Sequence, residues 1–147
     1  MLVDSKKQVL KPPQIIQNVA EQQDIKNVKR TMATLSVEFN MPHVWKCQQG
    51  NTIFIVHKSQ HPGYGYFRAL NADTAPNYLQ NSKDFIDSAY KVGFRHLVTQ
   101  FTDPSLLNLF KIISKNPMRE DMGYAVQKTD DGGFQVVVQL GPLEGGK

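Results

Sequence analysis

The chain has 147 residues, a length typical of one domain with one substantial hydrophobic core. Hydrophobic residues make up 40% and aromatic residues 10% of the sequence, so its composition is not that of a disordered chain. The formal charge of +4 favours anionic partners weakly, and no RNA- or DNA-binding motif accompanies the scattered lysines. We therefore expect a single domain over residues 1–141 and a flexible tail at 142–147, without a role in nucleic-acid binding.

Cysteine content and hydropathy indicate the cellular compartment in which the protein is expected. Cys47 is the only cysteine in the sequence, which excludes an intrachain disulfide framework and a cysteine-based zinc cluster. Residues 1–11 lack the apolar run of a signal peptide, and no later stretch is long and apolar enough to span a bilayer. We expect a soluble, cytoplasmic protein without membrane contact.

Two helices are expected near the amino terminus. After Pro12, apolar residues recur at helical spacing from Ile15 to Leu35, which turns one face of the segment toward a core. A break near residues 21–24 divides the segment into two helices. The run ends before Pro42, because the residue that precedes a proline avoids helical backbone angles.

The residues that follow have the period of strands. Residues 44–47 and 52–58 flank a turn around Gly50, and the second run is rich in β-branched and aromatic side chains. A second turn at residues 60–63 leads to a third apolar run at 64–70. These runs predict an antiparallel meander of three strands.

Helices and strands alternate in the next part of the chain. Pro76 opens a helix whose apolar residues recur at helical spacing until Gly93. Residues 94–101 predict a buried strand. Asp103 and Pro104 then provide an N-cap and a first-turn proline for a further helix.

That last helix is expected to stop at Asn116, where a proline follows. Residues 123–128 and 134–140 alternate around a turn at 129–133, whose aspartates and glycines accept positive φ, so a terminal hairpin is predicted. Taken together, the elements predict an α/β (α+β) domain in the order α-α-β-β-β-α-β-α-β-β. Its sheet should be mixed, mostly antiparallel and flanked by helices.

This order resembles that of the GNAT N-acyltransferase superfamily once a short first strand near Val9 and Leu10 is allowed. The resemblance covers nearly the whole chain, and degenerate GNAT-like chains of this kind are known among small phage proteins. In that family one strand runs into a phosphate-binding loop and helix, and the next strand splays away. Acyl-CoA enters the gap between them, which here would lie between residues 64–71 and residues 95–101.

The resemblance implies acetyl-CoA as the cofactor and an amine of unknown identity as the acyl acceptor. Backbone groups at residues 70–72 would contact the thioester and the pantetheine, and the start of the helix at Pro76 would hold the pyrophosphate. An asparagine on the following helix would add a further cofactor contact. The cofactor-binding residues expected on this basis are Leu70, Asn71, Ala72, Asn77 and Asn108.

The chain departs from the family pattern at two places. The family's loop carries Arg/Gln-x-x-Gly-x-Gly/Ala, whereas residues 72–77 contain no glycine and add Asp73, which would repel a pyrophosphate. Phe110 stands about where the family has a tyrosine that protonates the departing thiolate. These departures favour a second hypothesis, a non-catalytic GNAT-like binding or structural module that acts through a protein partner. A third hypothesis is an unrelated α/β adaptor with a closed sheet and no splay between the strands of Tyr66 and Val98.

Acyl transfer to an amine requires a general base, and the sequence offers three candidates. Glu38 is also readable as a solvated residue near a helix end, Asp73 as a helix-entry cap, and His57 as a half-exposed strand residue. For each of the three the structural role is the preferred interpretation, and the acid is unassigned.

Three further patterns have structural interpretations that we prefer to functional ones. His57 and His61 are spaced to share a metal only on a helix, whereas this segment is predicted as strand and turn, so no metal site is expected. Cys47 in a strand is interpreted as a small buried apolar residue rather than a nucleophile. Tyr66 and Phe67 could stack nucleic-acid bases, but core packing is the preferred interpretation.

Overall fold

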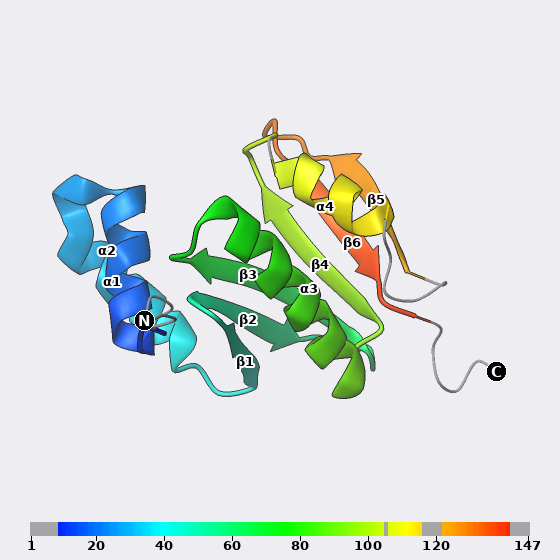
Figure 1. The fold of residues 1–147 in the computed structure, drawn as a ribbon, viewed down its shortest axis with the longest axis horizontal. Helices are drawn as coiled ribbons and strands as arrows, with labels where there is room; N and C mark the ends of the chain where they lie inside the picture. The colour runs from blue at the N-terminus through cyan, green and yellow to red at the C-terminus, as the bar shows by residue number, and fades with distance from the viewer. Residues whose placement is uncertain (1–8, 105, 116–121, 142–147) are drawn as a thin grey trace, which may run out of the picture.

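The computed structural model describes residues 9–104, 106–115 and 122–141 (Figure 1). The helices are α1 (Pro12–Gln23), α2 (Val28–Phe39), α3 (Ala75–Lys91) and α4 (Leu106–Lys115), with a short 3-10 helix, η2, at Ile25–Asn27. The strands are β1 (Val44–Gln49), β2 (Thr52–Lys58), β3 (Tyr64–Asn71), β4 (His96–Phe101), β5 (Gly123–Lys128) and β6 (Phe134–Gln139). This order confirms the predicted fold class. The expected helix stop at Asn116 and the expected tail at 142–147 lie outside the described residues.

The expected short strand near Val9 and Leu10 is wrong, because these residues do not pair with a strand. The Leu10 N–H donates to Oδ1 of Asn51 at 2.7 Å, and Nε2 of Gln48 donates to the Leu10 carbonyl at 2.8 Å. The N–H and carbonyl of Leu10 therefore bond side chains of β1 and of the β1–β2 turn, and not the backbone of a neighbouring strand.

The strand expected over residues 94–101 begins two residues later, at His96. The Phe94 N–H donates to the Ala89 carbonyl at 3.0 Å and so belongs to the end of α3. The N–H groups of Arg95 and His96 both donate to the Gly63 carbonyl, at 2.7 and 2.9 Å. The chain thus leaves α3 through a turn that fixes where β4 starts beside β3.

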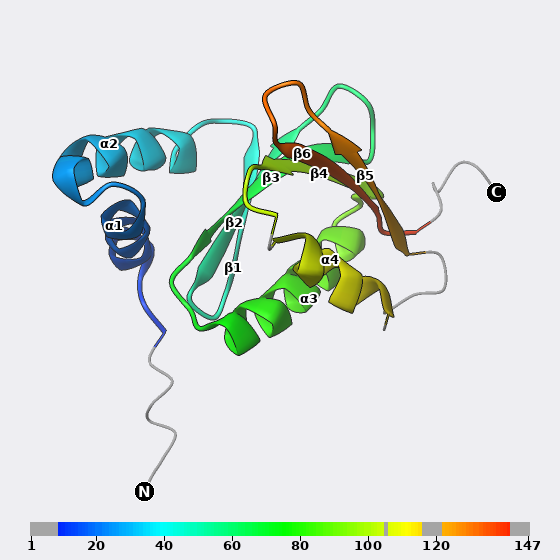
Figure 2. The same ribbon diagram turned by 90° about the horizontal axis from the view of Figure 1, so that it is seen from above.

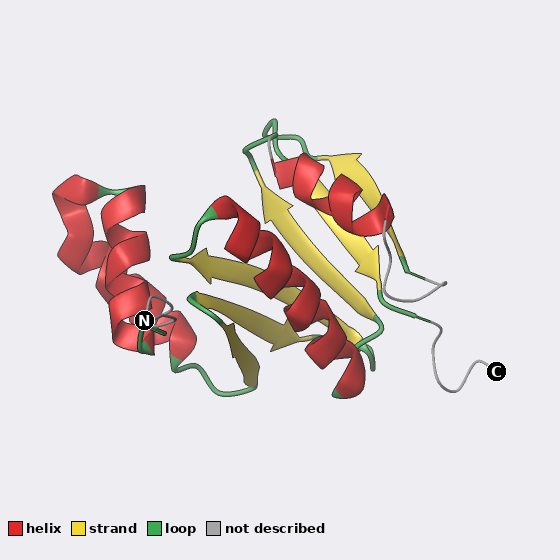
Figure 3. Cartoon of the chain, viewed as in Figure 1, coloured by secondary structure: helices red, strands yellow, loops and turns green. Residues whose placement is uncertain are grey.

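Helices α3 and α4 lie over one face of the sheet, and α1 and α2 lie against the other face beside β2 and β3, as Figure 2 and Figure 3 show. In β2, Ile53 and Ile55 join the cluster with α1 and α2, whereas Phe54 and Val56 join the cluster with α3. This strand is buried on both sides, which explains its continuous apolar run in the sequence. Among the described residues, no helix combines the length and apolar character that crossing a bilayer requires.

The strand order in the sheet is β1-β2-β3-β4-β6-β5. Neighbouring strands are antiparallel except β3 and β4, which run parallel and pair only at Tyr64↔His96, Gly65↔Leu97 and Tyr66↔Val98. Beyond Tyr66 the two strands part, and Figure 1 shows their arrowheads well separated. The closed sheet expected for an unrelated adaptor is therefore not the sheet that this chain forms.

Gly65 lies at the point where the two strands still pair. A Cβ at this position would meet Cγ1 of Val56 at 2.6 Å and Cε1 of Phe94 at 2.9 Å, so the neighbouring core side chains occupy the space that any other residue would need. The close approach of β2, β3 and the start of β4 depends on this missing side chain.

We predict that Gly65→Ala lowers the free energy of unfolding by about 1–3 kcal/mol, because the added methyl overpacks a filled core. Urea denaturation measures this loss. The matched control is Gly123→Ala in β5, where nothing lies within 4 Å of the added Cβ, and its effect should stay within about 0.5 kcal/mol. Equal stability of the two variants would contradict this account of the β3–β4 junction.

Candidate functional site

A cavity of about 200 Å³ lies between β3 and β4 where they part. Figure 1 shows α3 on the β3 side and α4 on the β4 side of the gap. The apolar walls come from β2, β3, β4, β6 and both helices, and include Phe54, Phe67, Phe85, Leu97, Phe110 and Val138. The cavity is therefore suited to a slender ligand with apolar segments.

Strand edges inside the gap carry backbone groups without a ladder partner. The Tyr64 carbonyl accepts from the Ser59 N–H, and the Ala72 N–H donates to the Asn51 carbonyl, so even-numbered residues of β3 bond on the β2 side. Because the direction alternates along a strand, the backbone groups of the odd-numbered residues point toward β4. The ladder ends at Tyr66↔Val98, which leaves the Phe67 carbonyl and the Ala69 N–H facing the gap. By the same alternation, the Gln100 N–H of β4 faces it from the other side. An extended ligand with amide groups could pair with these edges.

The loop before α3 is held by a network of side chains that the sequence did not reveal. Carboxylate oxygen Oδ2 of Asp73 accepts from the Asn51 N–H at 2.8 Å and from Nδ2 of Asn81 at 2.7 Å. The Asn71 side chain accepts from the Asp73 N–H at 3.0 Å and donates to the Asp73 carbonyl at 3.1 Å. Asp73 therefore bonds toward the β1–β2 turn. The expected cap role of Asp73 is wrong, because the N-cap residue of α3 is Thr74.

The five expected cofactor-binding residues do not gather around the cavity. Leu70 is buried in the α1 and α2 cluster, against which Ala72 also packs. Oδ1 of Asn71 accepts from Oγ1 of Thr52 at 2.8 Å, while Asn77 and Asn108 are exposed on α3 and α4. None of these five residues therefore lines the cavity.

The β3 residues that line the cavity are Phe67, Arg68 and Ala69, none of which was expected to bind the cofactor. Of these, Phe67 and Ala69 share one face of the strand. Strand alternation could have found them. Because Leu70 packs against α1 and α2, its neighbour Ala69 must face the other side of the sheet. The sequence alone did not show which face of β3, that of Ala69 or that of Leu70, carries the cavity.

Two of the three candidate bases lie together on the α2 side of the sheet. Glu38, near the end of α2, contacts Nε2 of His57 at 2.9 Å and Nη1 of Arg68 at 2.8 Å. The Glu38 side chain is 17% exposed, and Arg68 also contributes to the wall of the cavity. Tyr66 is paired with His57 across β2 and β3 and is 55% exposed. This arrangement places one carboxylate and one imidazole next to Arg68, a residue of the strand that borders the gap.

Aromatic rings close the α4 side of the cavity. Phe110 stacks on Phe101 with ring centroids 6.0 Å apart and lies 6.2 Å from the Tyr124 ring. On α3, burial raises the pKa of the Tyr78 phenol, which lines the same cavity. A phenol with a raised pKa stays protonated at neutral pH and keeps its hydrogen-bond donor.

The remaining candidates have structural surroundings. Cys47 is buried in the core under α3, and this burial raises the pKa of its thiol. His57 lies in β2, while His61 is exposed in the following turn. The His61 ring lies edge-on to the Tyr64 ring, with ring centroids 6.1 Å apart. Within the described residues, no cluster of three or more histidine, cysteine or carboxylate side chains could hold a metal ion.

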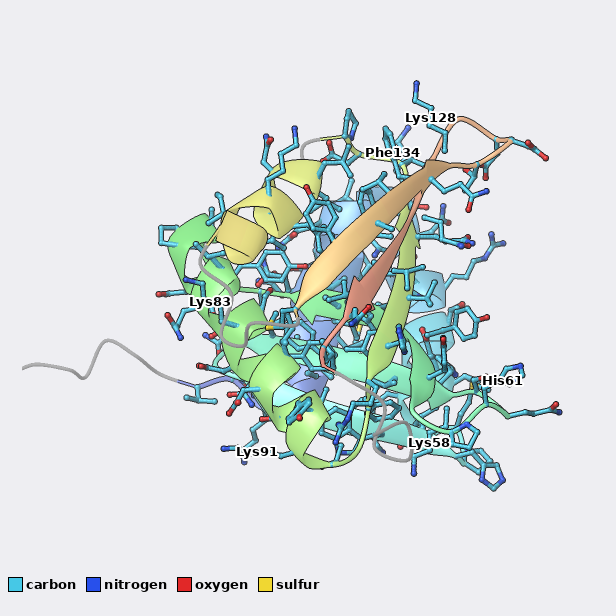
Figure 4. All side chains as sticks on the ribbon, turned by 90° about the vertical axis from the view of Figure 1, so that its right-hand side faces the viewer. Lys58, His61, Lys83, Lys91, Lys128 and Phe134 are labelled. Atoms are coloured by element: carbon cyan, nitrogen blue, oxygen red, sulfur yellow. The ribbon has the colours of Figure 1, made fainter. Side chains whose placement is uncertain are left out.

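The basic side chains labelled in Figure 4 lie at separate places around the molecule. Lys83 and Lys91 project from α3, whereas Lys58 ends β2 and Lys128 ends β5. These four lysines do not form a joint anion-binding surface.

We predict that Asn81→Ala lowers the free energy of unfolding by about 1–3 kcal/mol, because it removes donors from the Asp73 carboxylate and from Oγ1 of Thr52. The control is Asn77→Ala, an exposed asparagine in the first turn of the same helix, which should change stability by less than about 0.5 kcal/mol. Thermal unfolding of both variants measures the difference. An Asn81→Ala protein as stable as the wild type would show that the network does not hold the loop.

No protein-family model, curated protein or solved structure matches this chain. A functional proposal for it therefore depends on the cavity, on the free strand edges, and on Glu38 with its partners His57 and Arg68.

Proposed function

We propose that this chain is a GNAT-like N-acyltransferase, which binds acyl-CoA between β3 and β4 and transfers the acyl group to an amine. The observation that carries the proposal is the short parallel pairing of these strands, which ends at Tyr66↔Val98 and opens into an apolar cavity. The resemblance in element order points to the same place in the fold.

The free strand edges suit a pantetheine arm, which is extended and carries amide groups along its length. The Phe67 carbonyl and the Ala69 N–H would bond these amides in place of the missing part of the ladder. The surrounding apolar side chains would exclude water and so strengthen these hydrogen bonds. Only a narrow ligand would fit, because the cavity measures about 200 Å³.

The first turn of α3 would hold the pyrophosphate. The backbone N–H groups at the start of a helix have no acceptor within it, and the helix dipole favours an anion there. Pro76 supplies no N–H, so Ala75 and Asn77 would be the donors. Asp73 opposes the anion by its charge, but Asn51 and Asn81 hold its carboxylate toward the β1–β2 turn.

Glu38 with His57 would take the proton from the attacking amine. A neutral amine attacks the thioester carbonyl, the carbon–sulfur bond breaks, and the departing thiolate takes up a proton. Arg68 connects the two parts of the site, because it contacts Glu38 and also contributes to the cavity wall.

Filling the cavity tests the binding site. In the wild type, acetyl-CoA at 100 times its dissociation constant should add about 2.7 kcal/mol to the folded state, and Tm should rise by several degrees. We predict that Ala69→Phe abolishes this rise, because its side chain points into the cavity. Ala125→Phe on the exposed edge strand β5 is the control and should retain the full rise.

Two outcomes would contradict the proposal. An undiminished rise in Ala69→Phe would show that acetyl-CoA binds elsewhere. A wild type without any rise at millimolar acetyl-CoA would leave the non-catalytic module, acting through a protein partner, as the remaining hypothesis.

Replacing the base tests the chemistry. We predict that Glu38→Gln lowers kcat by about 10²–10⁴-fold while the acetyl-CoA-dependent rise in Tm is retained, because the amide cannot take up the amine proton. Release of the CoA thiol in the presence of a panel of primary amines measures the rate. The control is Glu21→Gln, an exposed glutamate of α1 that bonds Gln17. Equal rates for Glu38→Gln and the wild type would exclude Glu38 as the base.

A further inference from the structure

Three hydroxyl side chains lie in the wall of the cavity, whose other residues are apolar except Arg68 and Gln100. Tyr78 and Ser82 are four residues apart on α3 and so share one helix face, and Thr99 comes from β4 on the other side of the gap. We call Tyr78, Ser82 and Thr99 the hydroxyl cluster. Thr99 follows the same alternation as Leu97, which turns its side chain to the α3 and α4 side of the sheet.

Ser82 is the informative member of this cluster. The residue is only 5% exposed, and its Oγ has no hydrogen-bond partner among the described residues. A buried hydroxyl without a partner destabilises the folded state, and most buried hydroxyls in native proteins are therefore hydrogen-bonded. Because Ser82 lines the cavity, a ligand in the cavity can supply the missing partner.

The other two hydroxyls strengthen the case for a polar ligand group. The Tyr78 phenol carries its proton at neutral pH, and burial raises its pKa further, so it can donate to an acceptor in the cavity. Serine and threonine hydroxyls both donate and accept, so Ser82 and Thr99 can bond either side of an amide. A purely hydrocarbon chain would fill the cavity but would leave Ser82 unpartnered.

We propose that the hydroxyl cluster recognises an amide group of the pantetheine arm, and that it selects pantetheine thioesters over plain fatty chains. This inference rests on the proposed function, because it assigns the polar contacts of the same cavity. Sites built to bond a polar group of their ligand reject analogues that lack it, since the site's own polar atoms are then left unpaired.

The test compares Ser82→Ala with Ser88→Ala on the same helix. Ser88 does not line the cavity, and its Oγ accepts from Nε2 of Gln49 at 3.3 Å. Calorimetric titration with acetyl-CoA and with decanoate gives the affinities, and thermal unfolding without ligand gives the stability. We expect Ser82→Ala to keep or raise Tm without ligand and to bind acetyl-CoA about tenfold more weakly.

Ser88→Ala should show the opposite pattern, with a lower Tm and unchanged affinity for acetyl-CoA. Decanoate should bind the wild type much more weakly than acetyl-CoA does. Equal acetyl-CoA affinities of Ser82→Ala and the wild type would overturn the hydroxyl-cluster inference and leave the proposed function intact. A wild type that does not bind acetyl-CoA would overturn both, and binding of decanoate alone would reassign the cavity to fatty chains.

Discussion

The pairing of β3 with β4 over three residues is the constraint on which the rest of the structure depends. It brings the two halves of the sheet together at Gly65, where Val56 and Phe94 fill the space beside the bare backbone. Past this point β3 remains paired with β2 and β4 with β6, so each strand keeps one neighbour and exposes its other edge. The cavity follows from this geometry, since α3 and α4 cover the two halves of the sheet separately.

The same arrangement produces polar groups that the fold itself does not satisfy. Strand edges inside a domain are normally paired or covered, and buried hydroxyls are normally bonded. Here the Ala69 N–H faces the gap from β3, and Ser82 faces it from α3. In the loop before α3, by contrast, the Asp73 carboxylate is satisfied by its bonds to Asn51 and Asn81. The cavity thus has a free strand edge and a buried hydroxyl without a partner among the described residues, which supports a binding role for it.

Much of the fold was predictable because local signals agreed with it. Helical spacing from Ile15 to Leu35 marked α1 and α2, and the turn glycines marked the hairpins, including Gly132 with its φ of 87°. The site was less predictable, because its contacts join distant parts of the chain. Glu38 meets a histidine 19 residues away and an arginine 30 residues away, and periodicity carries no information about such pairs. Periodicity also did not indicate that Ala69, and not Leu70, lines the cavity.

Amide hydrogen exchange with and without acetyl-CoA tests the central claim most directly, because it reports on single backbone groups in the gap. The account predicts that the Ala69 and Gln100 amides exchange readily in the free protein and become protected when acetyl-CoA is bound. The Ile55 amide in the centre of β2 should be protected in both states, because this strand is paired on both sides. Unchanged exchange at Ala69 and Gln100 in saturating acetyl-CoA would contradict the assignment of the β3–β4 gap as the acyl-CoA site.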